Sequence, residues 1–99
     1  MSHRGSLLFM PSGIHGWQPQ SPLTLTEADF ACVVAESGKI EILLVGTGVR
    51  LEPLAPKLRQ VLKDAGMAVE IMSTGAAVRT LNVLLAEERA VAAALIAVD

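Results

Sequence analysis

The stretch that decides the fold is "IMSTGAAVRTLNVLLAEERAVAAALI", which runs from Ile71 to Ile96. It opens with the end of a strand-like run, passes through Ser-Thr-Gly and continues as a segment rich in alanine and leucine. A charged break, Glu87-Glu88-Arg89, separates that segment from a second apolar run. Strands that alternate with helices build layered α/β folds, so this stretch predicts an α/β chain.

The apolar run from Val91 to Val98 allows two interpretations. The alanines at 92–94 favour a continuation of the preceding helix, because alanine has the highest helix propensity. The charged break before the run, and the isoleucine and valine near its end, favour a turn and a final strand. Both interpretations stay open at this point, with the strand favoured.

Outside that stretch, the chain again alternates between strands and helices. The expected elements are strands at 7–10, 41–45 and 68–72, helices at 26–36, 54–65 and 74–87, and a loop at 14–22. Trp17 lies in the expected loop, where an indole usually covers an edge of the core and its N–H finds a partner. This order predicts an α/β layer fold with a mainly parallel sheet.

Size and composition predict one small domain over residues 1–99. Hydrophobic residues make up 52% of the chain and charged residues 18%, which argues against disorder. The net charge is −2, and the basic group of Lys57, Arg59 and Lys63 reads as a solvated helix face, so no nucleic-acid partner is expected. One cysteine and no long apolar run predict a cytoplasmic protein that does not insert into a membrane.

The helix expected at 74–87 has an unusual outer side. Placed at 100° per residue, five apolar residues share one side and should face the sheet: Ala77, Val78, Leu81, Leu84 and Leu85. The opposite side carries Gly75, Ala76, Arg79, Asn82, Val83 and Ala86. Small residues around one arginine suggest that this side of the helix is covered. The cover is expected to be either the loop around Trp17 or a partner. The guanidinium of Arg79 could anchor a carboxylate or a phosphate.

Two turns that follow strands are further candidates for binding. Ser73, Thr74 and Gly75 precede the long helix, where free N–H groups could hold an anion, although a plain N-cap is the commoner role. Gly46-Thr47-Gly48 follows another strand, but Leu51 stands where a dinucleotide loop needs glycine, so a turn with permissive backbone angles is expected. If strands 41–45 and 68–72 are parallel, both turns share one sheet edge.

Other chemistry is sparse in the sequence. His3 and His15 are 12 residues apart with no third ligand group, so no metal is expected. Cys32 lies beside the apolar stripe of its helix and is expected to be a packed thiol. No catalytic constellation or cofactor motif is evident, so an enzyme is less expected than a binding domain.

Three stretches resemble a widespread family of small α/β domains. They are "GSLLFMPSG" at 5–13, "ILLVGTG" at 42–48 and "LRQVLKDAGMAVEIMSTGAAVRTLNVLLAEERAVAAALI" at 58–96. The family includes a mitochondrial NADH dehydrogenase (complex I) assembly factor and the adipogenesis-associated domain proteins. The resemblance implies a three-layer fold with a central mixed sheet, no established enzymatic activity, and one or two further strands upstream of Gly5.

The resemblance also bears on the candidate residues. Arg79 and Asn82 match the family pattern, whereas Val78 and Leu81 stand where members often have cysteine and tyrosine. Both departures are expected to be packing substitutions on the core side of the helix. The leading hypothesis is therefore an interaction or assembly module that binds a protein partner or itself. The alternative is a small-molecule or anion binder, or a weak enzyme, that uses turns 46–48 and 73–75.

Overall fold

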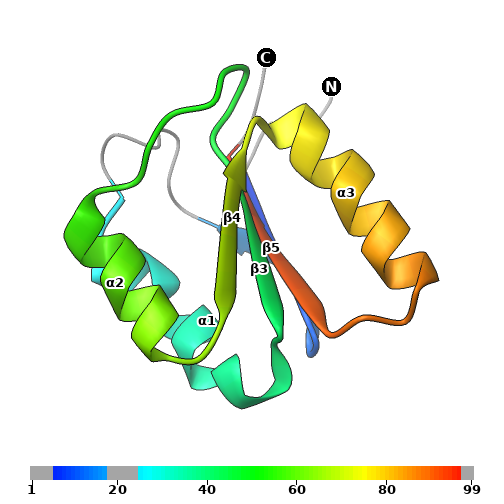
Figure 1. Cartoon of the computed structure of the whole chain (residues 1–99), viewed down its shortest axis with the longest axis horizontal. Helices are drawn as coiled ribbons and strands as arrows, with labels where there is room; N and C mark the ends of the chain where they lie inside the picture. The colour runs from blue at the N-terminus through cyan, green and yellow to red at the C-terminus, as the bar shows by residue number, and fades with distance from the viewer. Residues whose placement is uncertain (1–5, 18–24, 97–99) are drawn as a thin grey trace.

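A computed structural model describes residues 6–17 and 25–96 of the chain (Figure 1). Five strands are present in this part: β1 (Ser6–Met10), β2 (Gly13–Trp17), β3 (Ile42–Gly46), β4 (Ala68–Met72) and β5 (Val91–Leu95). The helices are α1 (Ala31–Ala35), α2 (Pro56–Asp64) and α3 (Thr74–Ala86), with short 3-10 turns η2 (Glu27–Phe30) and η3 (Ser37–Lys39). The expected alternation of strands and helices is thus confirmed.

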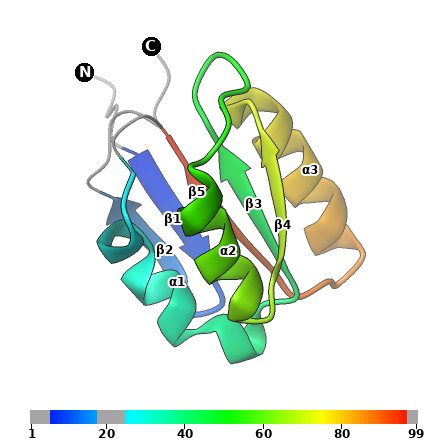
Figure 2. The ribbon, with the colours of Figure 1, turned by 60° about the vertical axis from the view of Figure 1, so that its left-hand side comes forward.

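The strands form one mixed sheet in the order β2-β1-β5-β3-β4. β3 pairs in parallel with both β4 and β5, and β1 pairs antiparallel with β5 and β2. Helices α1 and α2 cover one face of the sheet and α3 covers the other (Figure 2). The predicted fold class, a mixed sheet between helical layers, is confirmed.

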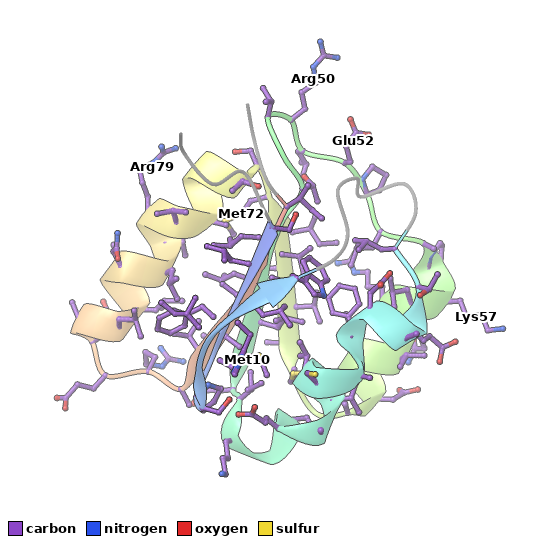
Figure 3. The ribbon with its side chains drawn as sticks, turned by 180° about the vertical axis from the view of Figure 1, so that it is seen from behind. Met10, Arg50, Glu52, Lys57, Met72 and Arg79 are labelled. Atoms are coloured by element: carbon purple, nitrogen blue, oxygen red, sulfur yellow. The ribbon has the colours of Figure 1, made fainter. Side chains whose placement is uncertain are left out.

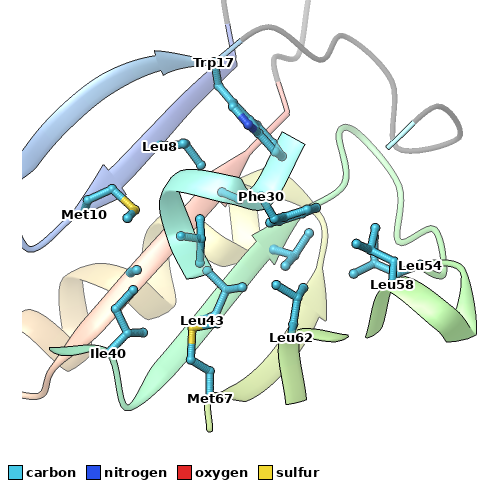
Figure 4. Close-up of a cluster of buried hydrophobic side chains, with 14 of the residues drawn as sticks. Leu8, Met10, Trp17, Phe30, Ile40, Leu43, Leu54, Leu58, Leu62 and Met67 are labelled. Carbon is cyan, nitrogen blue, oxygen red and sulfur yellow. The ribbon is translucent and has the colours of Figure 1, made fainter. Parts of the chain in front are cut away.

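The larger core lies between the sheet and the α1–α2 layer (Figure 4). Leu43 and Val45 of β3 point into it, and Phe30, Leu58 and Leu62 meet them from the helices. The helix predicted at 54–65 is confirmed as α2, although it begins at Pro56 rather than at position 54. Gly66 follows its last turn with a φ of 95°, the left-handed conformation that glycine adopts without steric cost.

The smaller core lies beneath α3. Ala77 and Leu81 of α3 pack against three residues on the side of the sheet that faces this helix. These are Leu44 of β3 and Val91 and Ala93 of β5. Because β5 is a central strand with a core on each face, small side chains such as Ala93 let α3 approach closely. Burial on both faces explains why an alanine-rich run forms a strand, and it settles the open interpretation of residues 91–98 in favour of the strand for the described part, Val91–Leu95.

The prediction of a loop at 14–22 is wrong for residues 14–17. Gly13–Trp17 forms strand β2, an antiparallel partner of β1 across the tight turn at Pro11 and Ser12. Four of its five residues are exposed, because β2 is an edge strand, and its sequence therefore lacks a strong apolar pattern. Residues 18–22 of that prediction lie outside the described part of the chain.

The segment from Thr26 to Lys39 follows the prediction in outline. Thr26 and Asp29 form a capping box, and Phe30 and Val33 are fully buried. Cys32, expected to be a packed thiol, is instead exposed. The α-helical part is only five residues long and lies on the molecular surface, so its one buried stripe leaves the thiol on the outer side.

Candidate functional site

The long helix α3 leaves more apolar surface exposed than its sequence predicts. Ala77 and Leu81 face the sheet as expected. Val78 and Leu85, expected in the core, are 39% and 38% exposed. The helix packs on β3, β5 and β4, whereas the sheet continues beyond β5 to β1 and β2. One helix is narrower than the sheet, so one flank of α3 overhangs strands that it does not cover.

The hydrogen bonds of Thr74 show which flank this is. The Thr74 hydroxyl donates to the carbonyl oxygen of Ile96, directly after β5. Val78 and Leu85 follow Thr74 at i+4 and i+11, so they lie on the same side of the helix. That side faces β5 and, beyond it, the β1–β2 hairpin.

The hairpin presents its own apolar side chains toward this flank. Leu8 and Met10 of β1 point into the larger core, so Leu7 and Phe9 point to the α3 side. Ile14 of β2 lies opposite Phe9 in the register and shares that side. Leu7 is 37% exposed and Ile14 is 64% exposed. We call Leu7, Ile14, Val78 and Leu85 the α3–hairpin surface.

Arg79 and Asn82 lie next to this surface, on the outer side of α3. Both are exposed, and Arg79 points away from the sheet in Figure 3. The guanidinium nitrogen Nη1 would lie 3.8 Å from a Cβ placed on Gly75, so the arginine passes over the small-residue start of the helix. The side chain of Arg79 forms no hydrogen bond or ion pair with a described residue. Trp17, from the loop suggested as its cover, packs in the core on the other face of the sheet.

The two strand-end turns do meet at one edge, as predicted from parallel β3 and β4. The Thr47 N–H donates to Met72 O at 2.9 Å, and the Thr74 N–H donates to Gly48 O at 2.8 Å. The Gly48 N–H in turn donates to the Thr74 hydroxyl at 2.9 Å. These hydrogen bonds link the two turns, so the donors and acceptors involved are already used within the chain.

The remaining groups of that edge are also largely engaged. Ser73 is the N-cap of α3, and its hydroxyl accepts from the Ala76 N–H. Gly46, Gly48 and Thr74 are buried, while Gly75 is exposed. The N–H groups that an anion would need are therefore mostly donors within the chain, and the edge acts as a structural junction. The permissive turn predicted at Gly48 is confirmed by its φ of 102°.

A third feature, missed at the level of sequence, joins the turn after α3 to β3. Arg89 forms a salt bridge with Glu41. The hydrogen bond that Arg89 donates to the Glu41 carboxylate, and then the negative charge of Glu41, raise the pKa of Arg89 above its ordinary value. Arg89 and Glu41 are 48 positions apart in the sequence, so no local pattern predicts that they pair.

The described part of the chain contains no cluster of metal-ligand side chains. No group of three or more His, Cys, Asp or Glu side chains could hold an ion among residues 6–17 and 25–96. Within the same ranges, no helix is long and apolar enough to span a membrane. The described residues offer surfaces for contact rather than an evident metal centre.

The fold and its surfaces define a class of protein: a small mixed-sheet α/β domain that exposes apolar side chains on one helix and one hairpin. The chain belongs to the family described as proteins of unknown function (DUF498/DUF598), whose model matches residues 1–96. The resemblance carried by residues 5–13, 42–48 and 58–96 is thereby confirmed.

Named relatives come from animals and bacteria. Mouse NADH dehydrogenase (ubiquinone) 1 alpha subcomplex assembly factor 3 is 36% identical over 92 residues, which are 93% of this chain and 50% of that protein. The chain therefore spans about half the length of the animal relatives it matches. An uncharacterised protein of Rhodobacter capsulatus is 36% identical over 94 residues, covering 95% of this chain and 70% of the relative.

Solved structures share the fold closely. A crystal structure described as an outer membrane protein from Bartonella henselae has a TM-score of 0.92 and 54% sequence identity. It covers all of this chain, which matches 83% of that protein. The fold of this chain is thus shared with that structure.

Proposed function

We propose that this chain is a non-enzymatic, assembly-factor-like domain that binds a protein partner through the α3–hairpin surface. The observation that carries the proposal is the exposure of apolar side chains by two separate elements on the same face of the sheet. Val78 and Leu85 come from α3, and Leu7 and Ile14 come from the β1–β2 hairpin. Contiguous exposed apolar side chains on a folded domain are a common mark of a protein interface.

Arg79 gives this surface a charged neighbour. Arginine is enriched at protein interfaces, because its guanidinium combines a flat apolar face with several hydrogen-bond donors. Its side chain has no partner among the described residues and crosses Gly75, so it is available to a carboxylate of a partner. Asn82, one turn further along α3, adds a donor and an acceptor to the same side.

The comparisons support an assembly-related function, since curated relatives are named as assembly factors. The internal hydrogen bonds of turns 46–48 and 73–75 weigh against the alternative of an anion site at that edge. An interaction domain needs rigid presentation of a surface, and the junction of the two turns supplies that rigidity at the start of α3.

The proposal is tested by affinity purification of tagged chains from native cells, followed by mass spectrometry. Val78→Asp and Arg79→Glu should each remove the same set of partner proteins, because one places a charge on the apolar surface and the other reverses its neighbouring charge. Circular dichroism should show that both variants remain folded, as both side chains are exposed.

Two control variants match these changes on the opposite side of the sheet. Val34→Asp alters a valine that is 37% exposed, close to the 39% of Val78, and Lys57→Glu reverses an exposed basic residue of α2. Both controls should retain the partners. A partner set that survives Val78→Asp and Arg79→Glu unchanged would overturn the proposal. A shift of the unmodified chain to dimers in analytical ultracentrifugation, abolished by Val78→Asp, would identify the partner as a second copy.

A further inference from the structure

A pocket lies on the face of the hairpin opposite to Ile14. It has a volume of about 370 Å³ and opens between β2 and the η2–α1 segment. His15 lies opposite Leu8 in the hairpin register, so its side chain points to the α1 side together with that of Trp17. Pockets for small molecules commonly enclose about 300–1,000 Å³, so this one is large enough for a small ligand.

The polar wall of the pocket is an ordered chain of three side chains. The Ser12 hydroxyl donates to Glu36 Oε2 at 2.7 Å and lies 3.0 Å from His15 Nε2. Serine has a single hydroxyl proton, which goes to the carboxylate, so Nε2 of His15 is the donor to Ser12. This direction is opposite to that of a serine nucleophile, and the chain therefore orients the Glu36 carboxylate rather than activating Ser12.

The second oxygen of that carboxylate is left unsatisfied. Glu36 Oε1 is buried and accepts no hydrogen bond from any described residue. A buried carboxylate oxygen without a donor is unfavourable, and native structures usually supply one from the protein, from water or from a ligand. Glu36 lines the pocket, so a positive charge held there stabilises its carboxylate even though Oε1 itself has almost no accessible surface.

The rest of the pocket is mainly apolar. The indole N–H of Trp17 is already used, because it donates to the carbonyl oxygen of Asp29 at 2.7 Å. The carboxylate of Asp29 is engaged by Thr26. Trp17 therefore offers carbon surface, and Leu8 and Ala28 extend that surface beside the Glu36 carboxylate.

From this arrangement we infer that the pocket binds a small primary amine with an apolar body, whose ammonium group pairs with the Glu36 carboxylate. A charged donor is favoured because hydrogen bonds between ionised groups are the stronger ones. The apolar body packs against Leu8, Ala28 and Trp17. This site is separate from the α3–hairpin surface, so it stands independently of the proposed function.

The chain contains its own reporter for this site. Cys32 is its one cysteine, is exposed and lines the pocket. The unmodified protein is treated with a thiol-selective methanethiosulfonate reagent in the presence of benzylamine or benzyl alcohol, and modification is followed by mass spectrometry. Benzylamine should slow the modification of Cys32 with an apparent affinity at least about tenfold higher than that of its neutral counterpart.

The same measurement on variants tests the role of the carboxylate. Glu36→Gln should weaken protection by benzylamine about tenfold, because the charged acceptor is lost. Glu27→Gln, an equal change of charge on an exposed neighbour outside the pocket, should leave protection unchanged. Equal protection by both compounds, or none by either, would overturn the inference without recourse to any variant. Full protection of Glu36→Gln by benzylamine would overturn it as well.

Discussion

The hydroxyl of Thr74 donates a 2.7 Å hydrogen bond to the carbonyl oxygen of Ile96, 22 residues later in the chain. The same hydroxyl accepts from the Gly48 N–H, and the Ile96 N–H donates to Gly46 O at 2.9 Å. One side chain thus holds the start of α3 against the ends of β3 and β5. The sheet edge considered as a binding site is a junction that fixes the position of α3.

Thr74→Val should therefore destabilise the protein by about 2–4 kcal/mol, because it leaves the Gly48 N–H and the Ile96 carbonyl without this partner in a buried position. The free energy of unfolding is measured by urea titration. Thr74→Ser keeps the hydroxyl and should cost only about 1 kcal/mol. Equal stability of the valine variant and the unmodified protein would show that the junction contributes little.

Gly46→Ala should also destabilise the protein, for a steric reason. A Cβ at this position would lie 2.8 Å from the Cα of Thr74 and 3.1 Å from Cδ2 of Leu95. Since the nearest atom belongs to the backbone, α3 must shift, at a cost of about 1–3 kcal/mol. Gly38→Ala is the control, because a Cβ there meets nothing within 4 Å. In urea unfolding, the alanine at 46 should lower the midpoint and the alanine at 38 should not.

Glu88→Gly should stabilise the protein by about 1 kcal/mol, because Glu88 has a φ of 59° at the end of α3. The Glu88 N–H donates to Leu85 O and the Arg89 N–H donates to Leu84 O, which is the hydrogen-bond pattern of a Schellman motif. Glycine adopts this conformation without strain. Glu87→Gly, where φ is −89°, should instead be neutral or destabilising. A lower thermal midpoint for Glu88→Gly would contradict this account.

Trp17→Phe should lower the free energy of unfolding by about 1–2 kcal/mol, since the indole donor to Asp29 O is lost and the carbonyl is left without it. The edge-to-face contact with Phe30, with ring centroids 5.3 Å apart, can be kept in part by the new ring. Unfolding is followed by circular dichroism, because Trp17 is the one tryptophan of the chain. Unchanged stability would mean that this hydrogen bond makes no net contribution.

Much of the fold was predictable because its signals are local. The apolar runs of β3 and β4, the helical spacing in α2 and the Ser73 cap of α3 each depend on a few neighbouring residues. Their boundaries agree with the sequence to within a few positions. The tryptophan was also correctly expected to cover an edge of the core with its N–H paired.

The errors share a physical origin in long-range packing. Strand β2 exists because β1 offers it hydrogen bonds, not because its own residues alternate strongly. The exposure of Val78 depends on how many strands lie beneath α3. Likewise, Ser12 and Glu36 are 24 positions apart in the sequence, so no local motif predicts the pocket that they line.

By itself, the sequence determined that this chain alternates strands and helices, where its main helices run and which family it resembles, because periodicity and capping act within a few residues. Only the tertiary structure decided which apolar side chains stay exposed and which polar groups are already engaged. Both depend on the order of strands in the sheet and on the width that α3 covers. Solvent exposure is a property of the assembled layers, and local patterns do not contain it.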